Sequence, residues 1–283
     1  MHNLAIVGIT GRMGQAMLRA LGEQSSLRLS GAIASSSSGR LGRDAAAEGA
    51  PTGVPVTADF PQGIRGAQVV ADFSAGTAVA GHAGTCAAEG IPLLVGATGL
   101  DAGAHEALRG AARHIAVLVA PNTSVGIGVT LGLAELAARG LGPSFDVEIL
   151  EIHHRHKRDA PSGTALALGE AVAAVRGRDL SQVASSQRGA GDPRAPGSIG
   201  FAVLRGGDIV GEHTVSFIAD GERIEITHRA TDRMIFARGA LRAAEWLTAQ
   251  RPGLYGMRQV LGLEGVDAVP KRGITALSYG GGP

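Results

Sequence analysis

The densest group of chemically active side chains lies in residues 151–165, which read EIHHRHKRDAPSGTA. Three of the nine histidines of the chain fall within four positions of this segment. Lys157 follows them, and Ser162 is typical of a helix N-cap, so the backbone amides of Gly163 and Thr164 would lie at the positive end of a helix. A cation, histidines and a helix N-terminus together predict a site for a small anion, especially a carboxylate.

A histidine of this segment is suited to proton transfer. Side chains alternate along a strand, so Glu151 and His153 would share one face of a strand over residues 146–153. A histidine among cations is pushed toward its neutral form, but it can still exchange a proton near working pH. Two other interpretations stay open, a metal site that uses His154 and His156 with a third ligand, and a solvated basic loop. Joint coordination by His153 and His154 is unfavourable, because alternation places them on opposite faces.

A second functional pattern lies near the N-terminus, where Gly8, Gly11 and Gly14 follow the apolar run Leu4–Val7. The order of strand, glycine turn and helix is a dinucleotide-binding pattern, here with GxxGxxG spacing. Its glycines allow a tight turn and a close approach to a pyrophosphate, which the helix N-terminus would bind. In a chain with 44 glycines, a purely structural turn is the alternative.

The type of dinucleotide depends on the residues at the end of the second predicted strand, Leu27–Ala34. An acidic residue there normally binds the ribose hydroxyls of NAD, but this chain has Ser35 to Ser38 and then Arg40. Because hydroxyls and an arginine could bind a 2′-phosphate, we predict NADPH as the preferred cofactor, with NADH as the alternative. The serines could also form only a flexible loop. The segments 96–99 and 120–123 follow two further strands and could face the same cofactor.

The first 124 residues alternate between short apolar strands and helices. The predicted strands are 4–7, 27–34, 68–73, 91–95 and 115–120. This alternation predicts βαβ units in a parallel, Rossmann-like sheet that helices cover on both faces. We therefore expect a dinucleotide-binding domain over residues 1–124.

After residue 124 the pattern changes to that of an α+β domain. Strand 146–153 lies between predicted helices, the polar stretch 187–197 predicts a long loop, and three strands then follow without helices between them. Gly206-Gly207 and Asp220-Gly221 predict hairpins between consecutive members of these three strands. We expect a mixed, largely antiparallel sheet in a substrate-binding and oligomerisation domain over 125–233, with 234–283 returning to the first domain.

Composition excludes several classes of function. The 26 basic and 25 acidic residues among 283 leave no electrostatic footprint for nucleic acid or an anionic membrane surface. Six Phe, two Tyr and one Trp are too few for a base-stacking surface. No run approaches about 20 apolar residues, and no signal peptide is evident, so we expect a cytoplasmic protein. Cys86 is the single cysteine, which excludes an internal disulfide and a cysteine-based zinc cluster, and we predict no metal.

Together these motifs resemble the dihydrodipicolinate reductase (4-hydroxy-tetrahydrodipicolinate reductase) family over nearly the whole chain. EIHHRHKRDAPSGTA is the most specific match, and VGITGRMG, GATG and NTSVG are similar to the cofactor loops of the family. The resemblance implies NAD(P)H-dependent reduction of 4-hydroxy-tetrahydrodipicolinate to tetrahydrodipicolinate in lysine and diaminopimelate biosynthesis. It also implies a small dicarboxylate substrate and a homotetramer.

The resemblance assigns roles to single residues of this chain. The proton donor falls on His153 and the companion catalytic lysine on Lys157, and substrate contacts fall on His154, Gly163 and Thr164. Ser35 and Ser36 stand where many members carry an acid–arginine pair. The implied cofactor contacts are Gly8, Ile9, Thr10, Gly11, Arg12, Met13, Ser35, Ser36, Gly96, Ala97, Thr98, Ala120, Pro121, Asn122 and Thr123.

Three other functions stay open. A semialdehyde dehydrogenase would need Cys86 as its nucleophile, but no base lies near it in sequence, and a small core residue is the simpler role. An amino-acid dehydrogenase would use the same cofactor. A non-catalytic NADP(H) sensor would keep the glycine loop but leave the His/Lys segment without a purpose.

Overall fold

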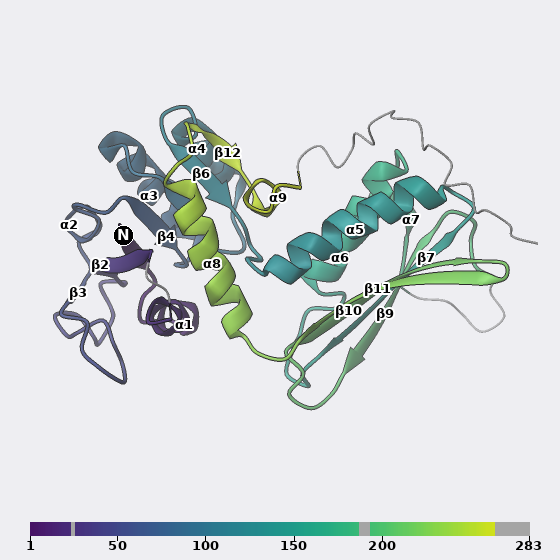
Figure 1. The fold of residues 1–283 in the computed structure, drawn as a ribbon, viewed down its shortest axis with the longest axis horizontal. Coiled ribbons are helices and arrows are strands. Elements are labelled where there is room, and N and C mark those ends of the chain that lie inside the picture. The colour runs from purple at the N-terminus through teal and green to yellow at the C-terminus, as the bar shows by residue number, and fades with distance from the viewer. Residues whose placement is uncertain (24–25, 187–192, 264–283) are drawn as a thin grey trace, which may run out of the picture.

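The computed structural model describes residues 1–23, 26–186 and 193–263, which form two lobes with one sheet each (Figure 1). The sheet of the first lobe is entirely parallel and that of the second is mixed, so the predicted α/β fold class with a Rossmann-like first sheet and an α+β second part is confirmed. No described helix is both long and apolar enough to cross a membrane. The end of the chain and most of the loop predicted over 187–197 lie outside the described residues.

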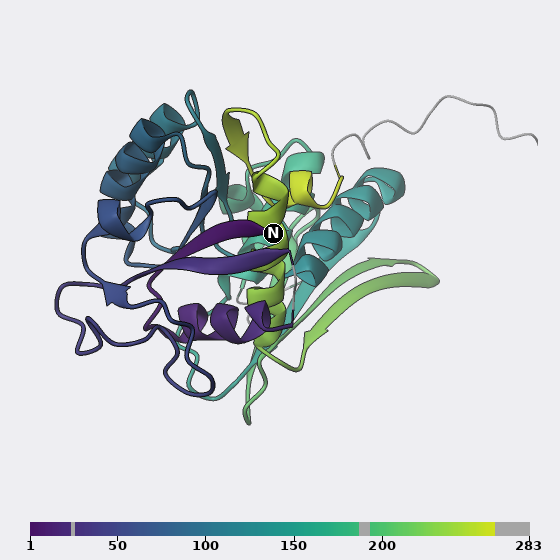
Figure 2. The same cartoon turned by 60° about the vertical axis from the view of Figure 1, so that its left-hand side comes forward.

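The first sheet lies between two layers of helices. Its strands are β1 (His2–Val7), β2 (Leu27–Ile33), β3 (Val56–Thr57), β4 (Val69–Asp72), β5 (Leu93–Val95), β6 (Ala116–Val119) and β12 (Gly253–Tyr255), in the order β12-β6-β5-β4-β1-β2-β3. One face is covered by α1 (Arg12–Leu21) and α8 (Met234–Leu247), and the other by α2 (Phe60–Gly63), α3 (Gly76–Glu89) and α4 (Ala102–Ala111) (Figure 2). The parallel order brings the carboxyl ends of the strands to one edge, where ligands of such sheets bind.

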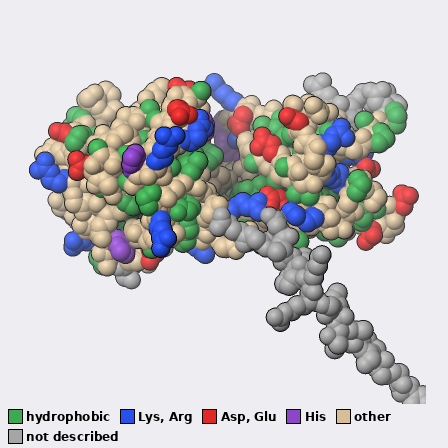
Figure 3. All heavy atoms as spheres, turned by 90° about the horizontal axis from the view of Figure 1, so that it is seen from above, with side chains coloured by type: hydrophobic (Ala, Val, Ile, Leu, Met, Phe, Trp, Pro, Cys, Tyr) green, Lys and Arg blue, Asp and Glu red, His purple; other side chains and the backbone are tan. Residues whose placement is uncertain are grey.

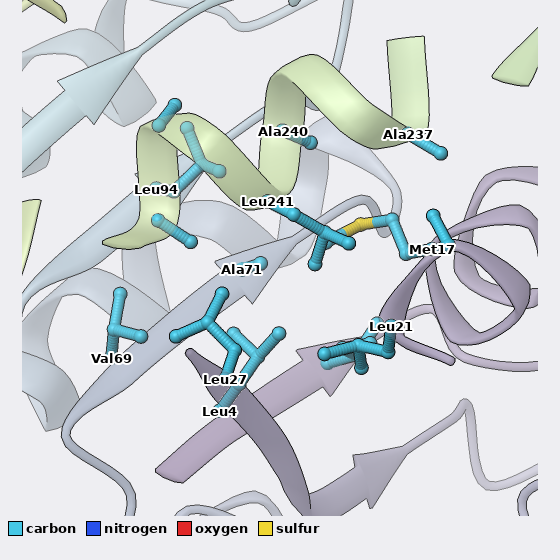
Figure 4. Packing of buried hydrophobic residues seen from close by; sticks show 14 of the residues in the cluster. Leu4, Met17, Leu21, Leu27, Val69, Ala71, Leu94, Ala237, Ala240 and Leu241 are labelled. Carbon is cyan, nitrogen blue, oxygen red and sulfur yellow. The ribbon is translucent and has the colours of Figure 1, made fainter. Parts of the chain in front are cut away.

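A core on the α1 and α8 face joins segments that are far apart in the sequence. Leu4 of β1, Met17 of α1, Leu94 of β5 and Leu241 of α8 are fully buried together (Figure 4). Burial of one such side chain contributes about 1.5–3 kcal/mol. The chain after residue 234 therefore packs on the first sheet, and β12 extends that sheet beside β6.

The second sheet carries helices on one face. Its strands are β7 (Asp146–His153), β8 (Ala184–Ser185), β9 (Ile199–Arg205), β10 (Gly211–Ala219) and β11 (Glu222–Ala230), in the order β11-β10-β7-β9-β8. Helices α5 (Val125–Leu141), α6 (Gly163–Val175) and α7 (Leu180–Val183) precede or interrupt these strands. Leu168 of α6 is buried in one core cluster with Val147, Ile149 and Phe217 of the sheet, whereas Leu204 on the opposite face is 52% exposed.

One of the two predicted hairpins is wrong. Asp220-Gly221 does join antiparallel neighbours, since Ala219 of β10 pairs with Glu222 of β11. Gly206-Gly207 instead crosses the end of β7, because β7 lies between β9 and β10 and pairs with both. Strands β7 and β9 are parallel neighbours with α6 between them in the chain, and β10 pairs with the other edge of β7, so the connection from β9 to β10 passes the end of β7, where Gly206 bonds to His153.

Several short elements have no counterpart in the predictions. They are β3, β8, β12, α2, α7 and α9 (Met257–Val260), each of two to four residues. Elements of this length are too short to show a hydrophobic period in the sequence. Of these, α9 matters for function because it contacts both lobes.

Candidate active site

A cavity of about 600 Å³ lies between the two lobes and collects most of the residues predicted to act on a substrate. Seen from above, the surface is hollowed where the lobes meet (Figure 3). The first lobe contributes the strand ends Thr98, Val119, Ala120, Pro121 and Asn122, with Met257 and Arg258 of α9. The second lobe contributes Ile127, Gly128, Leu131, His153, Lys157, Asp159, Ser162, Gly163, Thr164 and Ala167.

His153 is the last residue of β7 and is held on several sides. Its Nδ1 atom is 2.5 Å from Oε2 of Glu151, and its ring meets the ring of His213 edge-on at 5.1 Å between centroids. A Cβ atom at Gly211 would lie 2.9 Å from Nε2, so glycine at this position leaves room for the ring. Burial lowers the pKa of His153 below its usual value, while the carboxylate of Glu151 opposes this shift.

The carboxylate of Glu151 is fully buried and accepts four hydrogen bonds. Besides His153, the donors are Arg205, through Nη1 at 2.7 Å and Nη2 at 2.8 Å, and the backbone N–H of Ser162 at 3.0 Å. Burial alone would raise the pKa of Glu151, but the hydrogen bonds from Arg205 and His153 outweigh it and keep the carboxyl ionised. Alternation along the strand predicted that Glu151 lies on the same face as His153. Arg205 was not predicted, because it is 54 positions from Glu151 in the sequence and no local pattern connects the two.

The start of α6 has the groups from which the sequence predicts an anion site. Ser162 is the N-cap, as predicted, and its hydroxyl accepts a hydrogen bond from the N–H of Ala165 at 3.2 Å. The amides of Gly163 and Thr164 make no hydrogen bond to the described residues, and a Cβ atom at Gly163 would meet nothing within 4 Å. Lys157 borders the same cavity, with Nζ 2.8 Å from Oδ2 of Asp159. Two free amides and a cation thus face one space.

His154 lies apart from this cavity. Its backbone N–H donates to the carbonyl of Ile209 at 2.8 Å, and its ring centroid is 6.3 Å from that of His156. Within the described ranges, no group of three or more His, Cys, Asp or Glu side chains is placed to hold a metal ion. The same connection from β9 to β10 that replaced the predicted hairpin supports this segment, since Gly206 donates to the carbonyl of His153 and Gly207 accepts from Arg155.

The glycine loop has the geometry that the dinucleotide pattern needs. Gly8 has φ +78°, and a Cβ atom there would lie 2.6 Å from the carbonyl oxygen of Phe73. A Cβ atom at Gly14 would lie 2.4 Å from the carbonyl oxygen of Gly8. Gly11 is the N-cap of α1 and brings no capping side chain, and the first turn has no acidic residue. The first amides of α1 are therefore open to a phosphate group, so these residues fit a dinucleotide.

The other predicted cofactor residues differ in what they contact. Ser35 and Ser36 are exposed at the end of β2. Thr10, Gly11 and Arg12 border a larger cavity of about 1100 Å³ beside α1. Of the remaining positions, Ile9, Ala97 and Thr123 are buried, Met13 is half-buried, and Gly96 lies against the ring of Phe73, which a Cβ atom at 96 would overlap.

Arg40 and Cys86, which the sequence suggested for phosphate binding and for nucleophilic attack, are engaged elsewhere in the structure. Arg40 donates from Nη2 to the carbonyl oxygens of Asp44 at 2.7 Å and Ala46 at 2.6 Å, so half of its guanidinium holds a loop. Cys86 is fully buried in α3, and burial raises its pKa to about 12. A thiol with this pKa stays protonated at neutral pH, so the semialdehyde dehydrogenase alternative lacks its nucleophile.

Residues of α9 border the cavity without any sequence signal. Arg258 pairs with Glu135 of α5, and Leu261 packs over Gly128 of the same helix. This short helix follows β12 of the first sheet, so it links the two lobes beside the cavity.

Comparisons with known proteins give a consistent result. Residues 2–123 match the family model described as dihydrodipicolinate reductase, N-terminus, and residues 126–261 match the one described as dihydrodipicolinate reductase, C-terminus. A 4-hydroxy-tetrahydrodipicolinate reductase of Thiobacillus denitrificans is 48% identical over 263 residues, covering 92% of this chain and 98% of the relative. One from Nitrosospira multiformis is 49% identical with the same coverage.

Solved structures support the fold. A dipicolinate-bound dihydrodipicolinate reductase from Paenisporosarcina sp. TG-14 superposes with a TM-score of 0.74 at 24% identity, covering 92% of this chain and all of that one. An amine dehydrogenase from Mycobacterium smegmatis shares the arrangement less closely, with a TM-score of 0.56 at 13% identity over 89% of this chain and 94% of that one. The two-lobe fold therefore occurs with different chemistries, and the function must be argued from the site.

Proposed function

Because the chain belongs to the dihydrodipicolinate reductase family, we propose that it reduces 4-hydroxy-tetrahydrodipicolinate to tetrahydrodipicolinate, with His153 as the proton donor. Membership of this family makes the chain an NAD(P)H-dependent oxidoreductase of lysine and diaminopimelate biosynthesis. One observation supports this mechanism above all: His153, Lys157 and the free amides of α6 line one cavity at the strand ends of the first sheet.

The substrate is a cyclic dicarboxylate, and the second lobe offers matching groups for its carboxylates. Lys157 and the amides of Gly163 and Thr164 would donate charge-assisted or dipole-assisted hydrogen bonds to a carboxylate. Support comes from the similar Paenisporosarcina enzyme, which was solved with dipicolinate, itself a cyclic dicarboxylate. Substrate binding would displace Asp159 from Lys157, since both carboxylates compete for the same ammonium group.

The first lobe would hold the nicotinamide cofactor at the edge where its parallel strands end. The open amides of α1 would bind the pyrophosphate, and Thr98, Ala120 and Asn122 would border the nicotinamide end. When bound, the cofactor supplies the hydride that reduces the conjugated imine formed by loss of water from the substrate. Protonated on both ring nitrogens, His153 would then donate its Nε2 proton to the resulting enamine, while the Nδ1 hydrogen stays hydrogen-bonded to Glu151.

We propose that NADPH is preferred over NADH. No carboxylate ends β2, and the hydroxyls of Ser35 and Ser36 are exposed there. Nη2 of Arg40 is bound to backbone carbonyls, but Nε and Nη1 make no hydrogen bond to the described residues and would serve a 2′-phosphate. The ratio of Michaelis constants for the two cofactors tests this preference, and a clear preference for NADH contradicts it. Arg40→Ala should raise the constant for NADPH more than that for NADH, while Arg43→Ala serves as the neighbouring control.

We propose the domain division as residues 1–124 with 234–283 for the cofactor, and 125–233 for the substrate. Closure would then occur around the connections near 122–125 and 230–240, which join the lobes. We also propose that the chain acts in the cytoplasm as a homotetramer that uses the open face of the second sheet, where Leu204 is exposed. Light scattering at working concentration tests the assembly, and a monomer contradicts it.

One assay tests the activity directly. The chain should oxidise NADPH only when the condensation product of pyruvate and aspartate semialdehyde is present. Omission of either precursor is the control. Cofactor binding without turnover would instead favour a sensor, and turnover of an amino acid would favour an amino-acid dehydrogenase.

A further inference from the structure

We propose that Glu151 is a positioning residue for the reduction: clamped by Arg205, it holds the ring of His153 with Nδ1 toward itself and Nε2 toward the substrate. The inference rests on the proposed role of His153 as the proton donor. It goes further by assigning the orientation of that donor, and its supply of protons at neutral pH, to two residues, Glu151 and Arg205, that do not line the cavity.

The geometry of the pair leaves the carboxylate little freedom. Glu151 is fully buried, and both arms of the Arg205 guanidinium bind it, one to each carboxylate oxygen. Such a two-point contact fixes the plane of the carboxylate as well as its position. Oε2 is then directed at Nδ1 of His153, 2.5 Å away, so the hydrogen on Nδ1 has a single acceptor and the ring cannot turn over without losing it.

The other carboxylate oxygen connects this dyad to the anion site. Oε1 of Glu151 accepts the N–H of Ser162, the N-cap of α6, at 3.0 Å. Nη2 of Arg205 also donates to the carbonyl of Asp159 at 2.6 Å, next to the ion pair with Lys157. The two residues thus set the proton donor, the helix start and the lysine segment in one hydrogen-bonded unit.

Glu151 is the anion that favours the protonated form of His153, against the effect of the cations near the ring. Besides Glu151, the titratable and charged groups that act on its ring are Lys157 from the loop, Arg205 from β9 and His213 from β10. His213 is buried and its pKa is lowered to about 4, so it is neutral at working pH. Both cations disfavour a protonated His153, and Asp159 is already paired with Lys157. Removing the charge of Glu151 should therefore lower the pKa of His153.

A purely structural ion pair is the alternative, because a buried pair can join strands without any part in the reaction. The chain provides a matched control for this alternative. Arg194 binds Asp146 through Nη1 at 2.7 Å and Glu148 through Nε at 3.0 Å, at the opposite end of the same strand β7. A structural role predicts similar consequences for both arginine clamps, whereas a positioning role predicts an effect on the pH profile for Arg205 alone.

The experiment compares Glu151→Gln, Arg205→Lys and the control Arg194→Lys. For each variant, kcat and KM are measured from about pH 5 to 9, and thermal unfolding and NADPH binding confirm the fold. We expect Glu151→Gln to lower kcat at least about tenfold near pH 8, with its alkaline limb moved to lower pH and substrate KM changed less than about threefold. Arg205→Lys should show the same changes in smaller measure, and Arg194→Lys should match the parent profile.

An unchanged pH profile and kcat in a folded Glu151→Gln variant would overturn the proposal. If this variant does not fold, Arg205→Lys decides, since it keeps the cation and loses only the two-point contact. The substitution His153→Gln is run in parallel to separate the two levels of inference. Full activity of His153→Gln refutes its proton-donor role, whereas an inactive His153→Gln with a normal Glu151→Gln refutes the positioning role alone.

Discussion

The side-chain amide of Asn122 donates a hydrogen bond to the hydroxyl of Thr164 at 3.0 Å, across the cavity between the lobes. Asn122 follows β6 of the first sheet, and Thr164 lies in the first turn of α6. The same amide group accepts the N–H of Ser124 through its oxygen at 2.9 Å, so its orientation is fixed. This bond therefore connects the strand end proposed to bind the cofactor with the helix start proposed to bind the substrate.

Loss of that bond should weaken the coupling between the two sites. In Thr164→Val the hydroxyl is replaced by a methyl group of similar size, which leaves the amide of Asn122 without its partner. We expect substrate KM to rise about three- to tenfold, as for the loss of about one neutral hydrogen bond. NADPH binding in the absence of substrate, measured by fluorescence, should stay unchanged. A Michaelis constant equal to that of the parent would show that the bond has no part in substrate binding.

Replacement of His153, the proposed proton donor, should lower kcat. We expect His153→Gln to lower kcat about 10²–10⁴-fold, because no other described group bordering the cavity can supply the proton from the same place. The exposed neighbour His156 provides the control, and His156→Gln should stay within about twofold of the parent. Steady-state oxidation of NADPH measures both variants.

Substitutions of Lys157 and of its ionic partner Asp159 should change the substrate KM in opposite directions. Lys157→Ala should raise substrate KM about 10- to 100-fold and lower kcat, since a charge-assisted hydrogen bond is worth about 1.5–3 kcal/mol. In Asp159→Asn the competing charge is removed from Lys157, so substrate KM should fall, by no more than about fivefold because Asp159 is largely exposed. A rise of KM in Asp159→Asn would contradict the idea that Asp159 competes with the substrate.

Glycine in α8 should be required for stability close to the site. A Cβ atom at Gly239 would lie 1.9 Å from the carbonyl oxygen of Thr123, the residue after Asn122. We expect Gly239→Ala to lower the free energy of unfolding by about 1–3 kcal/mol, since backbone on both sides would have to move. Gly110 of α4 has open space around it, so Gly110→Ala should instead raise this free energy by about 0.5–1 kcal/mol. Urea unfolding of both variants checks the contrast.

The buried histidine beside His153 should make the fold sensitive to acid. Burial lowers the pKa of His213 in the native state to about 4, against about 6.5 in the unfolded chain. Between these values the unfolded state binds more protons, so stability should fall as pH drops from about 6.5 to 4, by up to about 3 kcal/mol. His213→Gln should remove this part of the dependence. Identical losses in the parent and the variant, measured by urea unfolding at several pH values, would contradict it.

Local sequence patterns were enough to predict the elements that form the proposed active site. The strand Asp146–His153 has the predicted bounds, and alternation alone placed Glu151 and His153 on its buried face. The N-cap at Ser162 followed from its residue type, and the glycine turn after β1 from its spacing. These features depend on neighbours within a few residues, which is the range over which backbone preference and side-chain periodicity act.

Contacts between distant segments were decided by the tertiary structure. A glycine turn, a histidine and lysine segment and two kinds of sheet were predictable from the sequence, because each depends on residues close together along the chain. The sequence could not determine that Arg205 would clamp Glu151, that Asn122 would reach Thr164, or that β7 would separate β9 from β10. Strand order and the position of the cavity depend on which apolar faces pack together in the folded protein. These faces belong to segments that are distant in the sequence and share no local pattern.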